Sequence, residues 1–259
     1  MSVVKPLYIY PMPYVFQEIR NVRTNSIFGY EALLRPEGGM APRDFVNTRM
    51  MMGGTHQLEL DTFFNAVKMF SELKMPGALK INSFPSECLD IHESRLLASE
   101  YGKEILSRVV LDILEYPFLN REAWYEKERF MLRYDMRCSL NAFGDGIFRD
   151  FSSLMFYHPD IVTIPGHMIH NFTDNPQQME YVRYMIQAFK EQDVMVLAQG
   201  IENVVEYQML VDFGIDLAQG YYIGMPGIPD PPEFIPDAVP DDADEAEVYD
   251  EDENYSEEF

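Results

Sequence analysis

The sequence has few cysteines and no lysine or arginine after Lys190. Its two cysteines, Cys88 and Cys138, are too few for a disulfide framework, which fits a reducing cytoplasm. No run approaches the roughly 20 apolar residues that a membrane helix needs. Prolines interrupt the apolar start of the chain, so we expect no signal peptide. These absences predict a cytoplasmic protein that does not contact a membrane.

Basic residues are scarce throughout the 259 residues, with 20 Lys and Arg against 43 Asp and Glu and a net charge of -23. This balance argues against nucleic-acid binding, because phosphate contacts need Lys and Arg. Residues 236–259 hold no basic residue and are crowded with Asp and Glu. We expect them to form a disordered acidic tail after a folded domain of residues 1–235. The tail either solubilises the protein or captures a basic partner.

Short apolar strands alternate with helices along the folded part. Residues 15–35 predict a β-hairpin, and later strands are predicted at residues 79–84, 109–114, 138–142, 160–164, 194–198 and 217–223. Helices are predicted at residues 42–52, 58–73, 85–99, 120–133, 177–192 and 204–213. This order is typical of βα units around a parallel sheet. Because the chain lacks a Gly-x-Gly-x-x-Gly loop, the pattern favours a barrel over an open Rossmann sheet.

Two short segments far apart in the sequence indicate a family. Residues 29–35, GYEALLR, alternate as a strand and place the carboxylate of Glu31 inside an apolar run, where a charge is costly unless it meets a cation or lies at the mouth of a site. Residues 219–222 read QGYY. Together they resemble the EAL domain, the bacterial family that hydrolyses cyclic di-GMP. The resemblance implies an α/β fold, a modified (β/α)8 TIM-like barrel with an antiparallel strand in the opening hairpin.

The resemblance also implies two sets of retained site residues. Residues that match the family's contacts to the dinucleotide and its last site position are Gln17, Arg35 and Gln219. Residues that match metal ligands are Glu31, Asn82 in the segment LKINS, and Asp112 in the segment DILE. Asp112 is one methylene shorter than the family's glutamate. We expect these three to be vestigial ligands that hold at most one divalent ion, weakly.

Four other family positions are replaced. The family's Asp-Asp-Phe-Gly-Thr-Gly loop reads NAFGDG here, so Asn141 and Ala142 stand where two metal-binding aspartates are implied. Thr163 takes the place of the catalytic lysine, and Gln199 takes the place of a glutamate. Two-metal hydrolysis needs anionic oxygen ligands that hold two ions about 4 Å apart, and an amide cannot accept a proton at neutral pH. Asp145 or Glu115 could substitute for one lost ligand, and Asp145 is the main candidate.

Three functions follow from this pattern. The first is a degenerate, non-catalytic EAL domain without a cofactor, which acts as a regulatory binding module for a protein partner and is compatible with a homodimer. The second is a divergent active phosphodiesterase that linearises cyclic di-GMP to pGpG with Mg²⁺ or Mn²⁺. The third is a non-hydrolysing cyclic di-GMP receptor. A structural role also stays open for Glu31, which could simply pair with Arg35 or Lys80.

Truncation after Ile235 should leave the thermal midpoint of the protein nearly unchanged. The acidic tail has few apolar side chains, so it cannot bury enough surface to offset the entropy of ordering it. Scanning calorimetry of the full chain and the truncated chain tests this. A fall of more than a few degrees would show that the tail packs on the folded domain.

Overall fold

The computed structural model describes residues 7–115, 119–143, 152–170 and 172–229, so the expected acidic tail lies outside the described residues. Eight strands close into a barrel in chain order. They are β1 (Tyr14–Asn21), β2 (Ile27–Leu34), β3 (Ala78–Ser83), β4 (Val109–Ile113), β5 (Arg137–Leu140), β6 (Ile161–Ile164), β7 (Met195–Gln199) and β8 (Leu217–Gln219). Strand β1 runs antiparallel to both β2 and β8, and the other neighbours are parallel. This confirms the modified barrel with an antiparallel strand.

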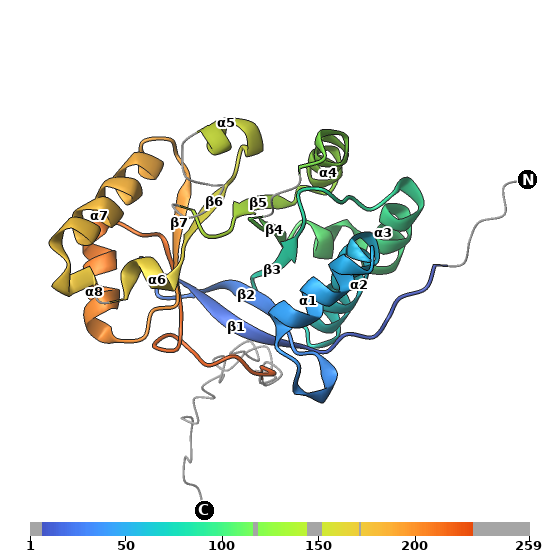
Figure 1. Ribbon diagram of the computed structural model, residues 1–259, viewed down its shortest axis with the longest axis horizontal. Coiled ribbons are helices and arrows are strands. Elements are labelled where there is room, and N and C mark those ends of the chain that lie inside the picture. The colour runs from blue at the N-terminus through green and yellow to red at the C-terminus, as the bar shows by residue number, and fades with distance from the viewer. Residues whose placement is uncertain (1–6, 116–118, 144–151, 171, 230–259) are drawn as a thin grey trace, which may run out of the picture.

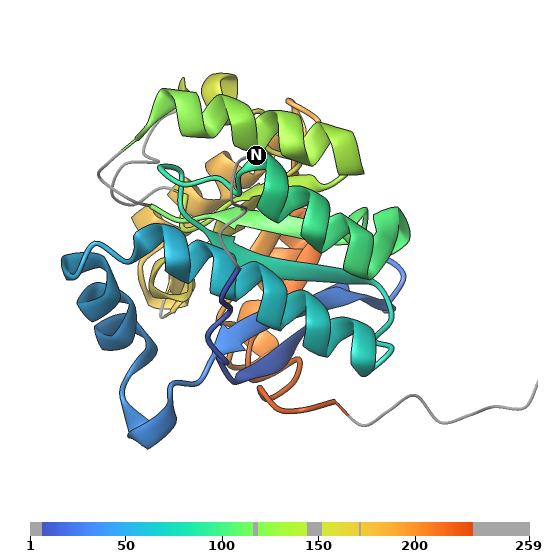
Figure 2. The same cartoon turned by 90° about the vertical axis from the view of Figure 1, so that its right-hand side faces the viewer.

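Helices flank the barrel in two groups. They are α1 (Pro42–Met51), α2 (Thr55–Glu72), α3 (Ile91–Leu106), α4 (Arg121–Tyr134), α5 (Ser152–Tyr157), α6 (Gly166–Ile169), α7 (Pro176–Lys190) and α8 (Val204–Phe213). Figure 1 shows α1–α4 on one side of the strands and α5–α8 on the other. Figure 2 shows α2, α3 and α4 side by side. Within the described ranges, no helix combines the length and apolarity needed to cross a membrane.

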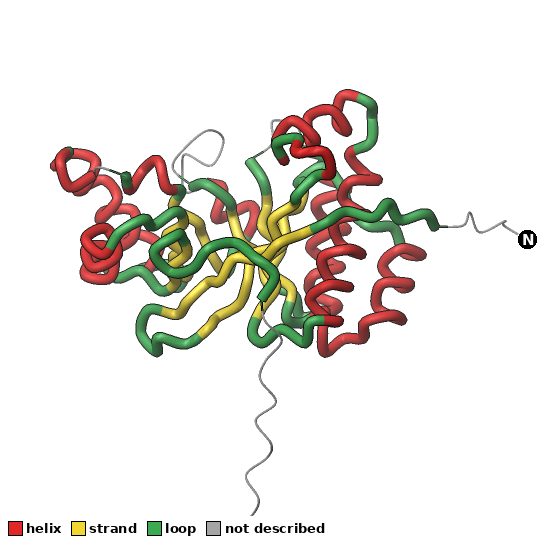
Figure 3. The backbone as a smooth tube through the Cα atoms, turned by 90° about the horizontal axis from the view of Figure 1, so that it is seen from below, coloured by secondary structure: helices red, strands yellow, loops and turns green. Residues whose placement is uncertain are grey.

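Seen from below, the strands lie between the two groups of helices, and the chain after β8 passes close to the opening hairpin (Figure 3). Phe16 of β1 exchanges two backbone hydrogen bonds with Gly227, with N···O distances of 2.7 and 2.9 Å. This contact fixes the segment after β8 to the outer edge of the hairpin. Strand β1 also contacts α2, where the Tyr14 hydroxyl donates to Thr62 Oγ1 at 3.2 Å.

The short helices α5 and α6 were not predicted from the sequence, and two predicted elements have clearly different bounds. The helix predicted at 85–99 begins at Ile91, because Asp90 accepts hydrogen bonds from the backbone N–H groups of His92 and Glu93, at 2.7 and 2.9 Å. This capping box fixes the start of the helix. The strand predicted at 217–223 ends at Gln219. The next residue, Gly220, has a φ of +152° and packs so closely on the backbone of Ile201 that a side chain would clash.

Two apolar clusters build the core. The larger one fills the space between the barrel and the helices. The smaller one contains Ile19, Ala78, Val110, Ile161, Leu197 and Leu217, which come from six different strands. Residues from alternate positions of barrel strands point to the interior. The smaller cluster is therefore an apolar layer inside the barrel, and the next inward positions toward the strand ends form the layer above it.

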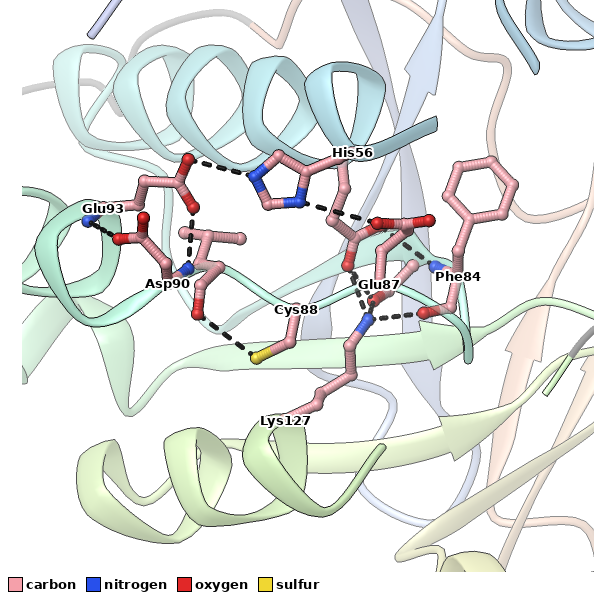
Figure 4. Close-up of polar contacts among 10 residues, drawn as sticks. His56, Phe84, Glu87, Cys88, Asp90, Glu93 and Lys127 are labelled. Atoms are coloured by element: carbon pink, nitrogen blue, oxygen red, sulfur yellow. Dashed lines mark hydrogen bonds and ion pairs between the residues drawn. The ribbon is translucent and has the colours of Figure 1, made fainter. Parts of the chain in front are cut away.

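A buried ion pair between Glu59 of α2 and Lys127 of α4 ties two helices to the end of β3. The Lys127 ammonium lies 2.5 Å from Glu59 Oε1 and donates to the carbonyl of Phe84 at 2.7 Å. The Ser83 hydroxyl donates to Glu59 Oε1 at 2.6 Å, and the Phe84 N–H donates to Oε2 at 3.0 Å. Figure 4 shows these contacts around Lys127. A buried pair is tolerated because each partner also has further hydrogen bonds.

Candidate functional site

A polar layer lies above the apolar layer inside the barrel. Its residues follow the apolar ones by two positions along the parallel strands, or precede them by two on the antiparallel strand. They are Gln17, Lys80, Asp112, Thr163, Gln199 and Gln219. Glu31 joins them from β2, where it is paired with Gln17 on one side and Lys80 on the other. The layer sits at the carboxyl ends of the parallel strands, where barrel enzymes carry their sites.

Glu31 is held by amide groups. Its Oε2 accepts hydrogen bonds from Gln199 Nε2 at 2.9 Å and from Gln219 Nε2 at 2.7 Å. The Gln219 amide also donates to Gln17 Oε1 at 3.2 Å, and Gln17 in turn donates to the carbonyl of Gly224 at 3.0 Å. Two residues expected to contact a dinucleotide, Gln17 and Gln219, are thus buried and bonded to one another.

Lys80 places a positive charge among the carboxylates of this layer. Its side chain is 2% exposed, and its Nζ lies 2.7 Å from Asp112 Oδ2 and 3.8 Å from Glu31 Oε2. The side-chain amide of Asn141 donates to the same Asp112 oxygen at 2.5 Å. Glu31 therefore pairs with Lys80, one of the two partners considered from the sequence. The other, Arg35, donates instead to the backbone carbonyl of Leu34 at 3.0 Å.

The charges of the layer depend on one another. Burial lowers the pKa of the Lys80 ammonium, but the charges of Asp112 and Glu31 outweigh burial, and the pKa is raised overall. Burial raises the pKa of the Glu31 carboxyl, the charge of Lys80 lowers it and that of Asp112 raises it, and the net direction is upward. The lysine is therefore held in its charged form, and it carries the only positive charge that contacts these two carboxylates among the described residues.

Arg35 lies apart from the buried glutamines. It borders a largely apolar cavity of about 300 Å³, which Arg43 and Asn82 also line. A second cavity, of about 240 Å³, is lined by Gln17 and Gln199. The structure thus brings Glu31, Lys80, Asp112 and the glutamines together and places Arg35 in a separate hollow of the same mouth.

The replaced positions carry no anionic ligand in the described part of the chain. Ala142 has a left-handed backbone, with a φ of 53°. Asp and Asn adopt that conformation more readily than Ala. Thr163 is fully buried, and its hydroxyl has no hydrogen-bond partner among the described residues. Asp145, the carboxylate that could substitute, lies outside the described residues.

Lys80 is a buried member of the site that was not predicted as a site residue from the sequence. Its signal was present, because Lys80 and Asn82 are two positions apart on one strand and so share a face of the barrel. From the sequence, Lys80 was expected only as a possible partner of Glu31 at the barrel rim. The structure buries it and gives it a second and shorter contact, to Asp112.

The fold and the polar layer define an α/β barrel with a candidate site at the strand ends, and the comparisons name its family. A family model for the EAL domain matches residues 12–226. The chain belongs to the EAL domain family. Its fold resembles that of a standalone EAL protein from Vibrio cholerae O395 in a c-di-GMP-bound form, with a TM-score of 0.75, 21% identity, and coverage of 86% of this chain and 97% of that one. It also resembles the manganese and cyclic di-GMP complex of Klebsiella pneumoniae BlrP1, with a TM-score of 0.72, 18% identity, and coverage of 85% and 57%.

Curated relatives are similar at low identity. The chain is 26% identical over 217 residues to the probable cyclic di-GMP phosphodiesterase PdeA of Escherichia coli K12. The aligned region covers 81% of this chain and 30% of PdeA. It is 27% identical over 212 residues to the cyclic di-GMP phosphodiesterase PdeF of the same organism. This alignment covers 76% of this chain and 28% of PdeF. The match thus spans less than a third of the length of these relatives.

Replacing Thr163 with Val should leave the free energy of unfolding unchanged or raise it by up to about 1 kcal/mol, because a buried hydroxyl without a partner is a burden on stability. Ser83→Ala is the matched control, since the Ser83 hydroxyl donates to the buried Glu59 carboxylate. The control should lose about 1–3 kcal/mol. Urea unfolding measures both. A loss in Thr163→Val as large as that in Ser83→Ala would show that the Thr163 hydroxyl has a partner.

Proposed function

We propose that this chain is a non-catalytic EAL domain that acts as a regulatory binding module in bacterial cyclic di-GMP-related signalling. The observation that carries the proposal is that donors within the polar layer engage one oxygen of each of its two carboxylates. Glu31 receives two amide donors, from Gln199 and Gln219, and Asp112 receives Lys80 and Asn141. These are donors, whereas a two-metal site needs acceptors at the same place.

The residues present do not fit two divalent ions. The described residues contain no group of three or more His, Cys, Asp or Glu that could hold a metal. Asp112 Oδ1 has no hydrogen-bond partner among the described residues, but Oδ2 of the same carboxylate already faces an ammonium. Ala142 keeps a left-handed backbone that would suit aspartate and offers no oxygen from its side chain. Hard cations prefer several anionic oxygens, which this arrangement lacks.

Exposed apolar side chains lie beside the site. Val204 and Val205, at the start of α8, are exposed, as are Tyr221 and Tyr222, which follow β8. The ring of Tyr222 contacts that of Tyr207 in α8 in a tilted arrangement, with centroids 5.4 Å apart, so the segment after β8 lies against α8. Exposed apolar side chains that gather in this way are typical of interaction surfaces. They support a role in binding a protein partner.

The purified protein should not convert cyclic di-GMP to pGpG with either Mg²⁺ or Mn²⁺. Chromatographic product analysis over several hours measures this, with an active EAL phosphodiesterase as the positive control. The reason is the joint replacement of acidic and basic groups by Ala142, Thr163 and Gln199. Metal-dependent product that disappears in Glu31→Ala would contradict the proposal and restore the divergent phosphodiesterase.

The cavity beside Arg35 favours a second candidate, a non-hydrolysing cyclic di-GMP receptor. The cavity measures about 300 Å³, has a largely apolar lining that includes Leu114 and Val46, and has the side chains of Arg35 and Arg43 at its border. Apolar walls suit a base, and a guanidinium suits a phosphate. The relatives from Vibrio cholerae and Klebsiella pneumoniae bind this dinucleotide in their crystal structures.

A receptor of this kind would bind cyclic di-GMP without metal, and Arg35→Ala would weaken the affinity about tenfold or more, because a charged hydrogen bond to phosphate contributes about 1.5–3 kcal/mol. Calorimetric titration with and without Mg²⁺ measures this. Arg95→Ala, at an exposed arginine of α3, is the matched control. Binding that requires Mg²⁺, or that Arg35→Ala leaves unchanged, would show that the receptor works in another way.

A further inference from the structure

The polar layer already contains a cation that belongs to the chain. Lys80 comes from β3, between β2 with Glu31 and β4 with Asp112, and its position is set by the closed barrel. Its Nζ is 2.7 Å from Asp112 Oδ2 and 3.8 Å from Glu31 Oε2. These two carboxylates are the acidic residues that match metal ligands of the family.

The rest of the layer supports the lysine rather than competing with it. Gln199 and Gln219 direct N–H groups to Glu31, and Asn141 directs one to Asp112. The donors converge on two oxygens, Glu31 Oε2 and Asp112 Oδ2, which are also the two oxygens that face the Lys80 ammonium. A divalent ion at this place would face the Lys80 ammonium at short range and would have to displace these donors.

We infer that Lys80 is a built-in cation that takes the place of a divalent metal in this EAL domain, so that Glu31 and Asp112 have a cationic partner without metal. The inference rests on the proposed function only in that both assign no metal to the site. It makes a distinct claim, because removing one lysine should create a metal site. Without Lys80, Glu31 and Asp112 lack a cationic partner, and Asn82, whose side chain hydrogen-bonds to Glu31, lies on the same strand face as position 80.

Thermal unfolding in EDTA and in Mn²⁺ tests this, with NaCl used to match the ionic strength. The midpoint of the wild type should be the same in both buffers. Lys80→Ala should have a lower midpoint in EDTA, and Mn²⁺ should raise it by about 3 °C or more, because an ion that binds only the folded state stabilises it. The double variant Lys80→Ala/Glu31→Gln should lose most of that rise, since one carboxylate is gone.

Lys127→Ala is the matched control. It also removes a buried lysine from an ion pair, but Lys127 faces one carboxylate, Glu59, where Lys80 faces two. Lys127→Ala should be destabilised in EDTA and should gain no comparable rise from Mn²⁺. A similar rise in both lysine variants would overturn the inference, because it would show a general effect of the ion on a weakened fold.

The wild type supplies a test that needs no lysine variant to fold. Mn²⁺ should stay free in electron paramagnetic resonance titrations of the wild type. Stoichiometric Mn²⁺ binding that Glu31→Gln abolishes would overturn the inference, as would a folded Lys80→Ala that gains nothing from Mn²⁺. These measurements use no dinucleotide, so Mn²⁺ binding by the wild type without hydrolysis would overturn this inference and leave the proposed function standing.

Discussion

The structure depends on how two carboxylates are neutralised inside a closed barrel. A buried carboxylate without a partner is too costly to keep, and a lone cation there is equally costly. Lys80 gives both carboxylates a cationic partner, and they in turn neutralise its buried charge. Its long unbranched side chain extends from β3 and places the ammonium beside Asp112 and within ion-pair distance of Glu31. The apolar layer directly below, from Ile19 to Leu217, can then pack without water. The polar layer above is fixed by direct bonds between strands.

The replaced residues make sense as a set. The four replaced positions, where the family resemblance implies anionic or basic groups, carry neutral side chains, and two of these donate to the remaining carboxylates. Asn141 donates to Asp112, and Gln199 donates to Glu31. Without a cation between them, the carboxylates of Glu31 and Asp112 would repel each other. The Lys80 ammonium and the two amides offset that repulsion.

Much of this could be predicted from the sequence. The hairpin and the later strands could be predicted from apolar periodicity, because the pleat of a strand sets which residues face the core. The barrel could be predicted from the alternation of strands and helices. The helix predicted at 85–99 begins at Ile91 instead, because the Asp90 and Glu93 capping box sets its first residue. The role of Lys80 depends on the register of β3 with its neighbours β2 and β4. Local sequence patterns do not show the register between strands that are far apart in the sequence.

The division of the mouth constrains what the domain can bind. Gln17 and Gln219 are engaged with each other and with Glu31, so they cannot turn toward a ligand without breaking those bonds. Arg35 is exposed beside its own cavity and is free to meet an anion. A ligand that touches both hollows must cross above Glu31 and Asp112, where Lys80 is already paired and adds little attraction for phosphate. The affinity for an anion therefore has to come from the arginine side of the mouth, whereas a protein partner can use the exposed tyrosines and valines around α8 without disturbing the polar layer.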